Sequence, residues 1–310
     1  MPPLRYHEGQ LAIQDEAKTT HVANKLAHWV GPVAQFALEA DLILLAAQDR
    51  DQVLRFSVLS GARPLLEVVE SADLRLRFPE PLSQHLPEGR CGGLAISFAL
   101  ARRARLNGVM TTRGGVKELD ASETFTLCRK YIAPSIALDA APCLGPTSRQ
   151  RIDLADPWLT KLLERAETSF LASVSPDGGP DVAHRGGPPG FLALDAGASL
   201  LSWPEFVGDG VFKSAGNVRA TGHFTLLVPD LESGDGVELV GVATYTNTRP
   251  ERRPRLDPLV QHKEHFPVQG LIEAHVSAAF RLEAILSRRR RIDEAFWVTS
   301  RSAVYDQAPQ

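Results

Sequence analysis

The chain has few cysteines, and they exclude two kinds of covalent framework. Its three cysteines, Cys91, Cys128 and Cys143, are an odd number without Cys-x-x-Cys spacing. This pattern argues against a disulfide scaffold and against a structural zinc site. We therefore expect reduced thiols, as in a reducing cytoplasm.

Long apolar runs and a strong net charge are also absent. The apolar run at residues 42–47 is far shorter than the roughly 20 residues that cross a bilayer. The first 16 residues contain no apolar core of signal-peptide length. The formal net charge is −3, which gives no electrostatic reason for general binding to nucleic acid or to a membrane surface. We expect a soluble cytoplasmic protein with neither kind of partner.

Local signatures of several enzyme classes are missing. The chain has no Gly-x-Ser-x-Gly elbow, Walker loop or Gly-x-Gly-x-x-Gly turn, so hydrolase and nucleotide-kinase functions lack support. His262, Glu264 and His265 do not have the i, i+4 spacing of a zinc helix, and we expect surface histidines and no metal. We interpret the arginine run at residues 288–291 as a solvated helix end or turn.

The chain does contain a series of short alternating segments. Of its 310 residues, 44% are hydrophobic and 23% are charged, which predicts a packed core. Apolar and polar residues alternate at residues 74–78, 94–98, 191–194, 224–228, 237–244 and 274–280. A period of two is typical of antiparallel strands with one buried face. The predicted fold class is mainly β with few helices.

The order of elements in the first half is repeated in the second. Asp156 and Pro157 predict a helix start, followed by a strand at 169–174 and a turn at 176–179. A helix beginning near Pro32, a strand at 42–47 and a polar turn at 48–52 correspond to them. Each half also has a strand interrupted by a glycine, at 105–109 and at 238–242.

Many short strands with Gly/Pro turns favour two closed or nearly closed barrels. We predict a degenerate N-terminal repeat at residues 1–133, a Pro-rich linker at 134–155 and a C-terminal repeat at 156–310. We expect the Arg- and Pro-rich loop at 247–265 to be ordered only where it packs on the pocket or on a partner.

Two segments of the second repeat carry the candidate site. Residues 181–191 read Asp-Val-Ala-His-Arg-Gly-Gly-Pro-Pro-Gly-Phe, a strand that runs into a Gly/Pro turn. Residues 208–217 place Lys213, Ser214 and Asn217 after a glycine-rich bend. Together with Arg185 they offer cations, a hydroxyl, an amide and backbone N–H groups, as a phosphate-bearing ligand requires. Arg185 could instead pair with Asp177 or Asp181 in a surface contact.

These two segments resemble the pyridoxamine 5'-phosphate oxidase-related, FMN-binding split-barrel superfamily, in the branch with His-Arg-Gly-Gly-x-Pro-Gly-Phe. Residues 7–14 and 125–132 resemble pieces of that branch more loosely. The resemblance implies split β-barrels that pair with FMN in the groove between them. The tandem halves would form this pair within one chain as an internal pseudo-dimer, and the whole chain could form a homodimer.

By this resemblance the cofactor-binding residues are His184, Arg185, Gly186, Gly187, Pro189, Ser202, Trp203, Lys213, Ser214 and Asn217. Arg185, Lys213 and Ser214 would contact the phosphate, and Trp203 would lie along the flavin ring. Aromatic residues on strands usually belong to the hydrophobic core, so Trp203 could instead be a core residue. No catalytic acid or base can be selected.

The resemblance implies an FMN-dependent oxidoreductase that acts on a small organic substrate at the groove, with F420 as an alternative cofactor. Departures from the family pattern motivate other functions. The first half has Gly-Ala-Arg-Pro-Leu-Leu in place of the Gly/Pro turn, and Val211 stands where many relatives have a basic residue. The alternatives are a cofactor-free binding or tailoring protein that reuses the groove, and a non-catalytic flavin-binding module.

Overall fold

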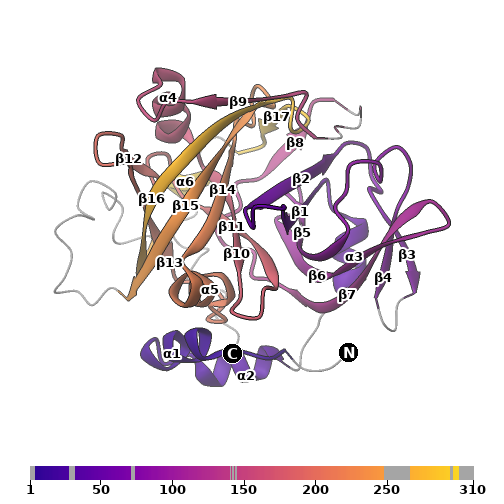
Figure 1. Cartoon of the computed structure of the whole chain (residues 1–310), viewed down its shortest axis with the longest axis horizontal. Helices are drawn as coiled ribbons and strands as arrows, with labels where there is room; N and C mark the ends of the chain where they lie inside the picture. The colour runs from indigo at the N-terminus through magenta and orange to yellow at the C-terminus, as the bar shows by residue number, and fades with distance from the viewer. Residues whose placement is uncertain are drawn as a thin grey trace.

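Two antiparallel sheets with the same strand order make up most of the molecule (Figure 1). The computed structural model describes residues 4–27, 32–70, 74–139, 141, 143, 145–247, 266–293 and 296–299. The histidines and glutamate at 262–265, and all of the expected loop at 247–265 except its first residue, lie outside these ranges.

The first sheet contains seven strands in the order β2-β1-β5-β6-β7-β4-β3. Its strands are β1 (Leu42–Gln48), β2 (Leu54–Ser60), β3 (Glu67–Glu70), β4 (Arg75–Phe78), β5 (Gly89–Ser97), β6 (Arg102–Arg113) and β7 (Val116–Thr126). The second sheet follows the order β11-β10-β14-β15-β16-β13-β12, with β9 paired to β16. Its strands are β9 (Ser148–Ile152), β10 (Thr168–Val174), β11 (Pro180–Gly186), β12 (Ala193–Asp195), β13 (Leu200–Phe206), β14 (His223–Pro229), β15 (Gly236–Asn247) and β16 (Val268–Glu283).

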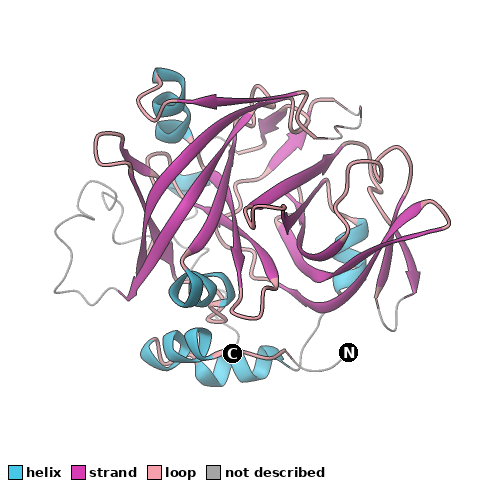
Figure 2. Cartoon of the chain, viewed as in Figure 1, coloured by secondary structure: helices cyan, strands magenta, loops and turns pink. Residues whose placement is uncertain are grey.

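The two orders match strand for strand, so the predicted repetition of one pattern is confirmed. Strands dominate the described chain and helices are few and short (Figure 2), which confirms the mainly β prediction. The helices are α1 (Glu8–Glu16), α2 (Thr20–Ala27), α3 (Val33–Leu38), α4 (Pro157–Arg165), α5 (Lys213–Thr221) and α6 (Phe296–Thr299). None of the described helices is long and apolar enough to cross a membrane.

A glycine sits at the same irregularity in both sheets. The register shifts between Asn107 and Gly108 in β6, and between Val240 and Gly241 in β15. A Cβ at Gly108 would lie 2.2 Å from the carbonyl oxygen of Asp120, and one at Gly241 would lie 2.0 Å from that of His275. Only glycine permits such close approach of the neighbouring strand.

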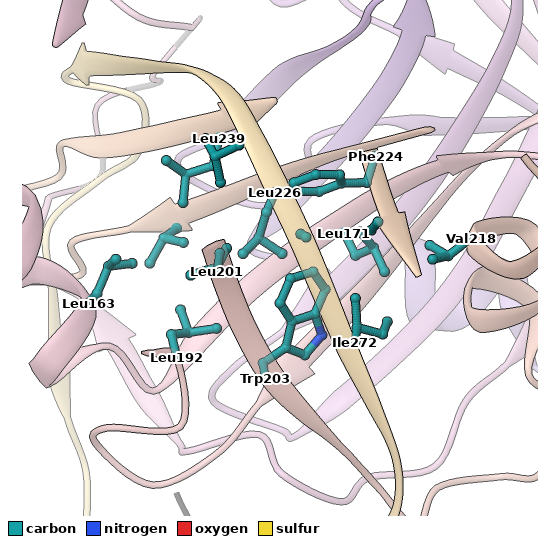
Figure 3. Close-up of a cluster of buried hydrophobic side chains, with 14 of the residues drawn as sticks. Leu163, Leu171, Leu192, Leu201, Trp203, Val218, Phe224, Leu226, Leu239 and Ile272 are labelled. Carbon is teal, nitrogen blue, oxygen red and sulfur yellow. The ribbon is translucent and has the colours of Figure 1, made fainter. Parts of the chain in front are cut away.

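Each sheet curls around its own apolar core, so that each half forms a barrel. In the second sheet, Leu171, Leu226, Leu239 and Ile272 come from four different strands and meet around Trp203 of β13 (Figure 3). Leu45, Leu76 and Leu106 belong to the corresponding core of the first sheet. We call these halves the N-terminal barrel and the C-terminal barrel.

A third apolar cluster joins the two barrels. Along β10, Leu171 faces the C-terminal core, while Phe170 and Ala172 belong to the cluster between the barrels. The side chains of β1 alternate in the same way, with Leu44 in the shared cluster and Leu45 in its own core. Both central strands are therefore buried on both faces, and this burial holds the halves together.

The segment predicted as linker contains two strands. β9 joins the second sheet, and β8 (Ser135–Ala137) pairs with β17 (Arg289–Arg291). Arg289 is buried and donates to Asp41 at 3.1 Å, and Arg291 pairs with Glu167. The interpretation of this arginine run as solvated is wrong for Arg289, because it connects the C-terminal segment to the N-terminal barrel.

Candidate functional site

A cavity of about 90 Å³ lies between the two barrels. From the N-terminal barrel it is lined by Arg103 and Arg105 of β6 and by Cys128, just after β7. From the C-terminal barrel it is lined by the end of β11, by residues 204–206 of β13 and by the segment that leads into α5. We call it the inter-barrel cavity.

His184 of β11 lines this cavity as a buried ring between the barrels. Its ring centroid lies 5.7 Å from that of Phe170 and 6.4 Å from that of Phe98. Arg103 Nη1 lies 2.6 Å from His184 Nδ1. Because a guanidinium has no acceptor atom, Nδ1 accepts this bond and the ring proton lies on Nε2. Within the described chain, His184 Nε2 is buried without a hydrogen-bond partner.

The charge state of His184 follows from this environment. Burial lowers its pKa well below 6.5, and the cations of Arg103 and Arg185 lower it further. At neutral pH the imidazole is therefore uncharged. It can donate one hydrogen bond from Nε2, but it adds no positive charge.

Asp181, at the other end of β11, ties three elements together. It accepts hydrogen bonds from Arg105 of β6 at 3.0 Å, from Asn107 at 2.9 Å and from Ser214 of α5 at 2.8 Å. Burial alone would raise the pKa of this carboxyl. The cations of Arg105 and Lys213, with the hydrogen bonds from Asn107 and Ser214, lower it overall. Asp181 is therefore an ionised group at the centre of the contact between the barrels.

Helix α5 begins at the wall of the cavity without a side-chain cap. Phe212, the residue before the helix, has a left-handed backbone with φ of 54° and makes no capping bond. Lys213 and Ser214 are only 8% and 2% exposed. The first N–H groups of a helix require partners and favour an anion. A buried helix start of this kind is suited to a negatively charged group.

Two of the cations that line the cavity, Lys213 and Arg185, already face carboxylates of the protein, whereas Arg103 contacts His184 and Cys128. Lys213 Nζ lies 2.7 Å from Glu123 of β7, and Arg185 pairs with Glu205 of β13. The partner of Arg185 is thus neither Asp177 nor Asp181, the two partners considered from the sequence. An anion that pairs with Lys213 or Arg185 must replace one of these carboxylates, and Glu123 is the more exposed, at 29% against 7% for Glu205.

Five of the residues predicted from the sequence line the inter-barrel cavity: His184, Arg185, Gly186, Lys213 and Ser214. Gly186 packs directly on the N-terminal half, because a Cβ there would lie 1.9 Å from the carbonyl oxygen of Tyr131. Gly187 is in the following turn, where a Cβ would lie 2.7 Å from Phe191.

The other five predicted residues, Gly187 among them, do not line this cavity. Trp203 is fully buried in the C-terminal core (Figure 3), and its Nε1 donates to Glu205 at 3.2 Å. Ser202 is on the opposite face of β13, because successive side chains of a strand alternate. Pro189 lines a separate cavity, and Asn217 lines another of about 330 Å³.

The structure adds a helix that the site prediction did not include. α1 belongs to the predicted N-terminal repeat but packs against α5 of the C-terminal barrel. His7 Nε2 and Gln10 Nε2 donate to Asn217 Oδ1 at 2.8 and 3.0 Å, and Gln14 Nε2 donates to the carbonyl oxygen of Val211 at 2.9 Å. The sequence signal was the stretch 7–14, which resembles the same family branch.

Arg103 and Arg105 were also not predicted. They lie two residues apart on β6, and both contact β11 of the other barrel. Alternate arginines in a strand of period two are a usable signal, since they share one face. Which barrel they face can be known only from the three-dimensional structure.

No family model and no curated protein matches the chain. Solved structures are similar to it over less than half its length. A pyridoxamine 5'-phosphate oxidase candidate from Lactobacillus delbrueckii is 19% identical, with 44% of this chain and 98% of the other covered and a TM-score of 0.32. An F420 reductase is 20% identical, with 38% and 93% covered and a TM-score of 0.26. HutZ, a heme storage protein from Vibrio cholerae, is 12% identical, with 41% and 91% covered and a TM-score of 0.27.

Proposed function

We propose that this chain binds a small phosphate-bearing organic molecule in the inter-barrel cavity, with the anion at the start of α5. The observation that carries the proposal is the buried, uncapped start of this helix beside Lys213, Ser214 and Arg185. Helix starts of this kind bind phosphate through backbone N–H groups and the helix dipole.

The residues of this chain would each do one task in that complex. The first N–H groups of α5 would donate to the anion, and Lys213 would exchange Glu123 for it, whereas the hydroxyl of Ser214 already donates to Asp181. His184 would donate from Nε2, its only atom able to do so. Asp181 would keep Arg105 and Ser214 in place, because it is ionised and almost fully buried.

Flavin mononucleotide is the molecule that the sequence resemblance implies. The cavity suits its phosphate end but is too small for its ring. The phosphate end is matched by the donors at α5. The ring end is not, because the cavity is about 90 Å³ and pockets for small molecules generally measure about 300–1,000 Å³. The ring would require the barrels to separate locally, so we derive no redox step.

An FMN-dependent oxidoreductase acting on a small organic substrate is nevertheless the second candidate function. The convergence of five sequence-predicted residues on one cavity favours it. In that case flavin would supply the electron transfer, and the residues named above would hold its phosphate.

The absorption spectrum of the purified protein and titrations with FMN, riboflavin and inorganic phosphate test both candidates. The proposal expects FMN to bind more tightly than riboflavin, which lacks the phosphate, and expects Lys213→Met to weaken FMN binding about tenfold. Arg288→Gln is a control, since Arg288 pairs with Asp139 away from the cavity.

Equal affinity for FMN and riboflavin, or no binding of FMN and phosphate at millimolar concentration, would reject the phosphate site. A bound yellow flavin that is reduced and reoxidised would favour the oxidoreductase.

A further inference from the structure

A separate cavity of about 420 Å³, which we call the rear cavity, lies behind the Gly/Pro turn of residues 186–190. It is bounded by α4, by the start of β10, by the end of β14 and by the β8 and β17 pair. Pro189 lines it, whereas Gly186, at the other end of the same turn, lines the inter-barrel cavity. Its volume is within the range of small-molecule pockets.

The walls of this rear cavity combine an apolar surface with charged groups. Leu138, Leu162, Ala166, Pro189 and Leu231 contribute apolar side chains. Leu138 is 53% exposed, so part of this apolar surface is in contact with water. A ligand with an apolar body would cover this surface.

The charges of the rear cavity leave one cation available. Four arginines line it, and three of them are paired: Arg289 with Asp41, Arg291 with Glu167 and Arg165 with Asp230. Arg290 is exposed and has no carboxylate partner among the described residues. Of the lining carboxylates, Glu167 and Asp230 are the partners of Arg291 and Arg165, so Arg290 and the exposed Glu232 are the lining charges without an ion-pair partner among the described residues.

Thr168 provides an independent indication of a ligand. It lines the rear cavity, is 2% exposed, and its Oγ1 has no hydrogen-bond partner within the described chain. Buried hydroxyls in folded proteins are nearly always hydrogen-bonded. A hydroxyl can donate to an anionic oxygen, so Thr168 and Arg290 suit the same chemical group.

We propose that the rear cavity binds a small organic carboxylate with an apolar body. The carboxylate pairs with Arg290 and accepts a hydrogen bond from Thr168, and the body lies against Leu138 and Leu162. This site uses none of the residues assigned to the phosphate site, and it requires no flavin.

Calorimetric titration with octanoate and with octylammonium tests the proposal, because the two probes share an alkyl body and differ in the sign of their charge. We expect octanoate to bind and octylammonium to bind at least about tenfold more weakly. Arg290→Gln should weaken octanoate binding about tenfold, whereas Arg50→Gln, a change at an exposed arginine outside the cavity, should leave it unchanged. Lys213→Met should also leave it unchanged, so the two proposals can fail separately.

Thr168→Val keeps the shape of the side chain and removes the hydroxyl. It should weaken octanoate binding about two- to tenfold without lowering the melting temperature of the ligand-free protein. Equal binding of the two probes, or unchanged octanoate affinity in Arg290→Gln, would overturn the proposal. A lower melting temperature of ligand-free Thr168→Val would also overturn it, because the hydroxyl would then already have a partner in the protein.

Discussion

The two barrels contact each other through equivalent positions that carry opposite charges. In the repeat, Arg105 of β6 corresponds to Glu238 of β15, and Arg55 of β2 corresponds to Asp181 of β11. Arg105 pairs with Asp181 at 3.0 Å, and Glu238 lies 3.9 Å from Arg55. The duplicated fold thus keeps one contact in two copies with the charges exchanged, so complementarity between the halves does not require identical sequences.

A second difference lies in the connection between equivalent strands. Residues 79–88 join β4 to β5, and they bury Leu82 and Leu86 in the N-terminal core. Residues 207–222 join β13 to β14 and contain α5, which presents Lys213 and Ser214 to the inter-barrel cavity. The strands are constrained by burial in both copies, whereas the connections have been free to diverge. One connection therefore contains a helix whose start lines the cavity, and the other packs into its own core.

Breaking the buried contact between Arg105 and Asp181 should have the largest effect on stability. Asp181→Asn removes the charge that balances Arg105, whose side chain is 4% exposed, and should lower the free energy of unfolding by about 3–5 kcal/mol. Glu238→Gln should cost less, because its partners Arg149 and Arg55 are 32% and 33% exposed and remain solvated. Urea unfolding at pH 7 measures both, and equal losses would contradict the difference between the two contacts.

The loss of stability at acidic pH provides a second test of the role of Asp181. The pKa of Asp181 is lowered in the folded protein, so its contribution is present above the unfolded value of about 3.9 and is lost as pH falls through the folded value. Asp181→Asn should therefore flatten the decline in stability below about pH 4.

Substitution of the equivalent glycines of the two barrels should have a smaller effect on stability. Gly108→Ala and Gly241→Ala each place a Cβ against a backbone carbonyl, and each should cost about 1–3 kcal/mol or more. Gly197→Ala is the control, because the atom nearest to its Cβ, apart from the flanking residues, would be Asp195 Oδ1 at 3.5 Å. If the two barrels unfold together, both variants shift one cooperative transition. Two separate transitions would show that the barrels unfold independently.

The smallest effect concerns a residue present in one copy only. His184 corresponds to Val58 in the N-terminal barrel, and both lie between the barrels. Because the folded pKa of His184 is lowered, the unfolded chain binds a proton below about pH 6.5 that the folded chain does not. This residue should therefore lower stability by at most about 1.4 kcal/mol per pH unit as pH falls. His184→Val should remove that slope between pH 6.5 and 5, as measured by unfolding at several pH values. An unchanged slope would assign it to other groups.

Much of the fold could be predicted from the sequence because its signals are local. Asp156 caps α4, with Pro157 in its first turn, as predicted from residue type, and α3 begins just after Pro32. The glycines of β6 and β15 marked equivalent positions before their bulges were known. The short strands β8 and β9 were not predicted, because their partners lie more than a hundred residues away in sequence.

The site was predictable only in part, for a related reason. The motif predicted His184, Arg185 and Ser214, which line the inter-barrel cavity, but motif membership does not say which face of a strand a side chain occupies. Leu201 and Trp203 alternate with polar Ser202, and this pattern places the tryptophan in the core, as the structure does. The carboxylates that neutralise the cations come from other strands, and no local pattern pairs them.

The burial of β1 and β10 on both faces has a consequence for how the site is assembled. A barrel on its own would expose Phe170 and Leu44 to water and would have to find a second barrel by diffusion. Joining the two in one polypeptide replaces that encounter with a permanent local concentration of the partner. The inter-barrel cavity therefore forms at any dilution of the protein, and each copy is free to lose whatever the other supplies.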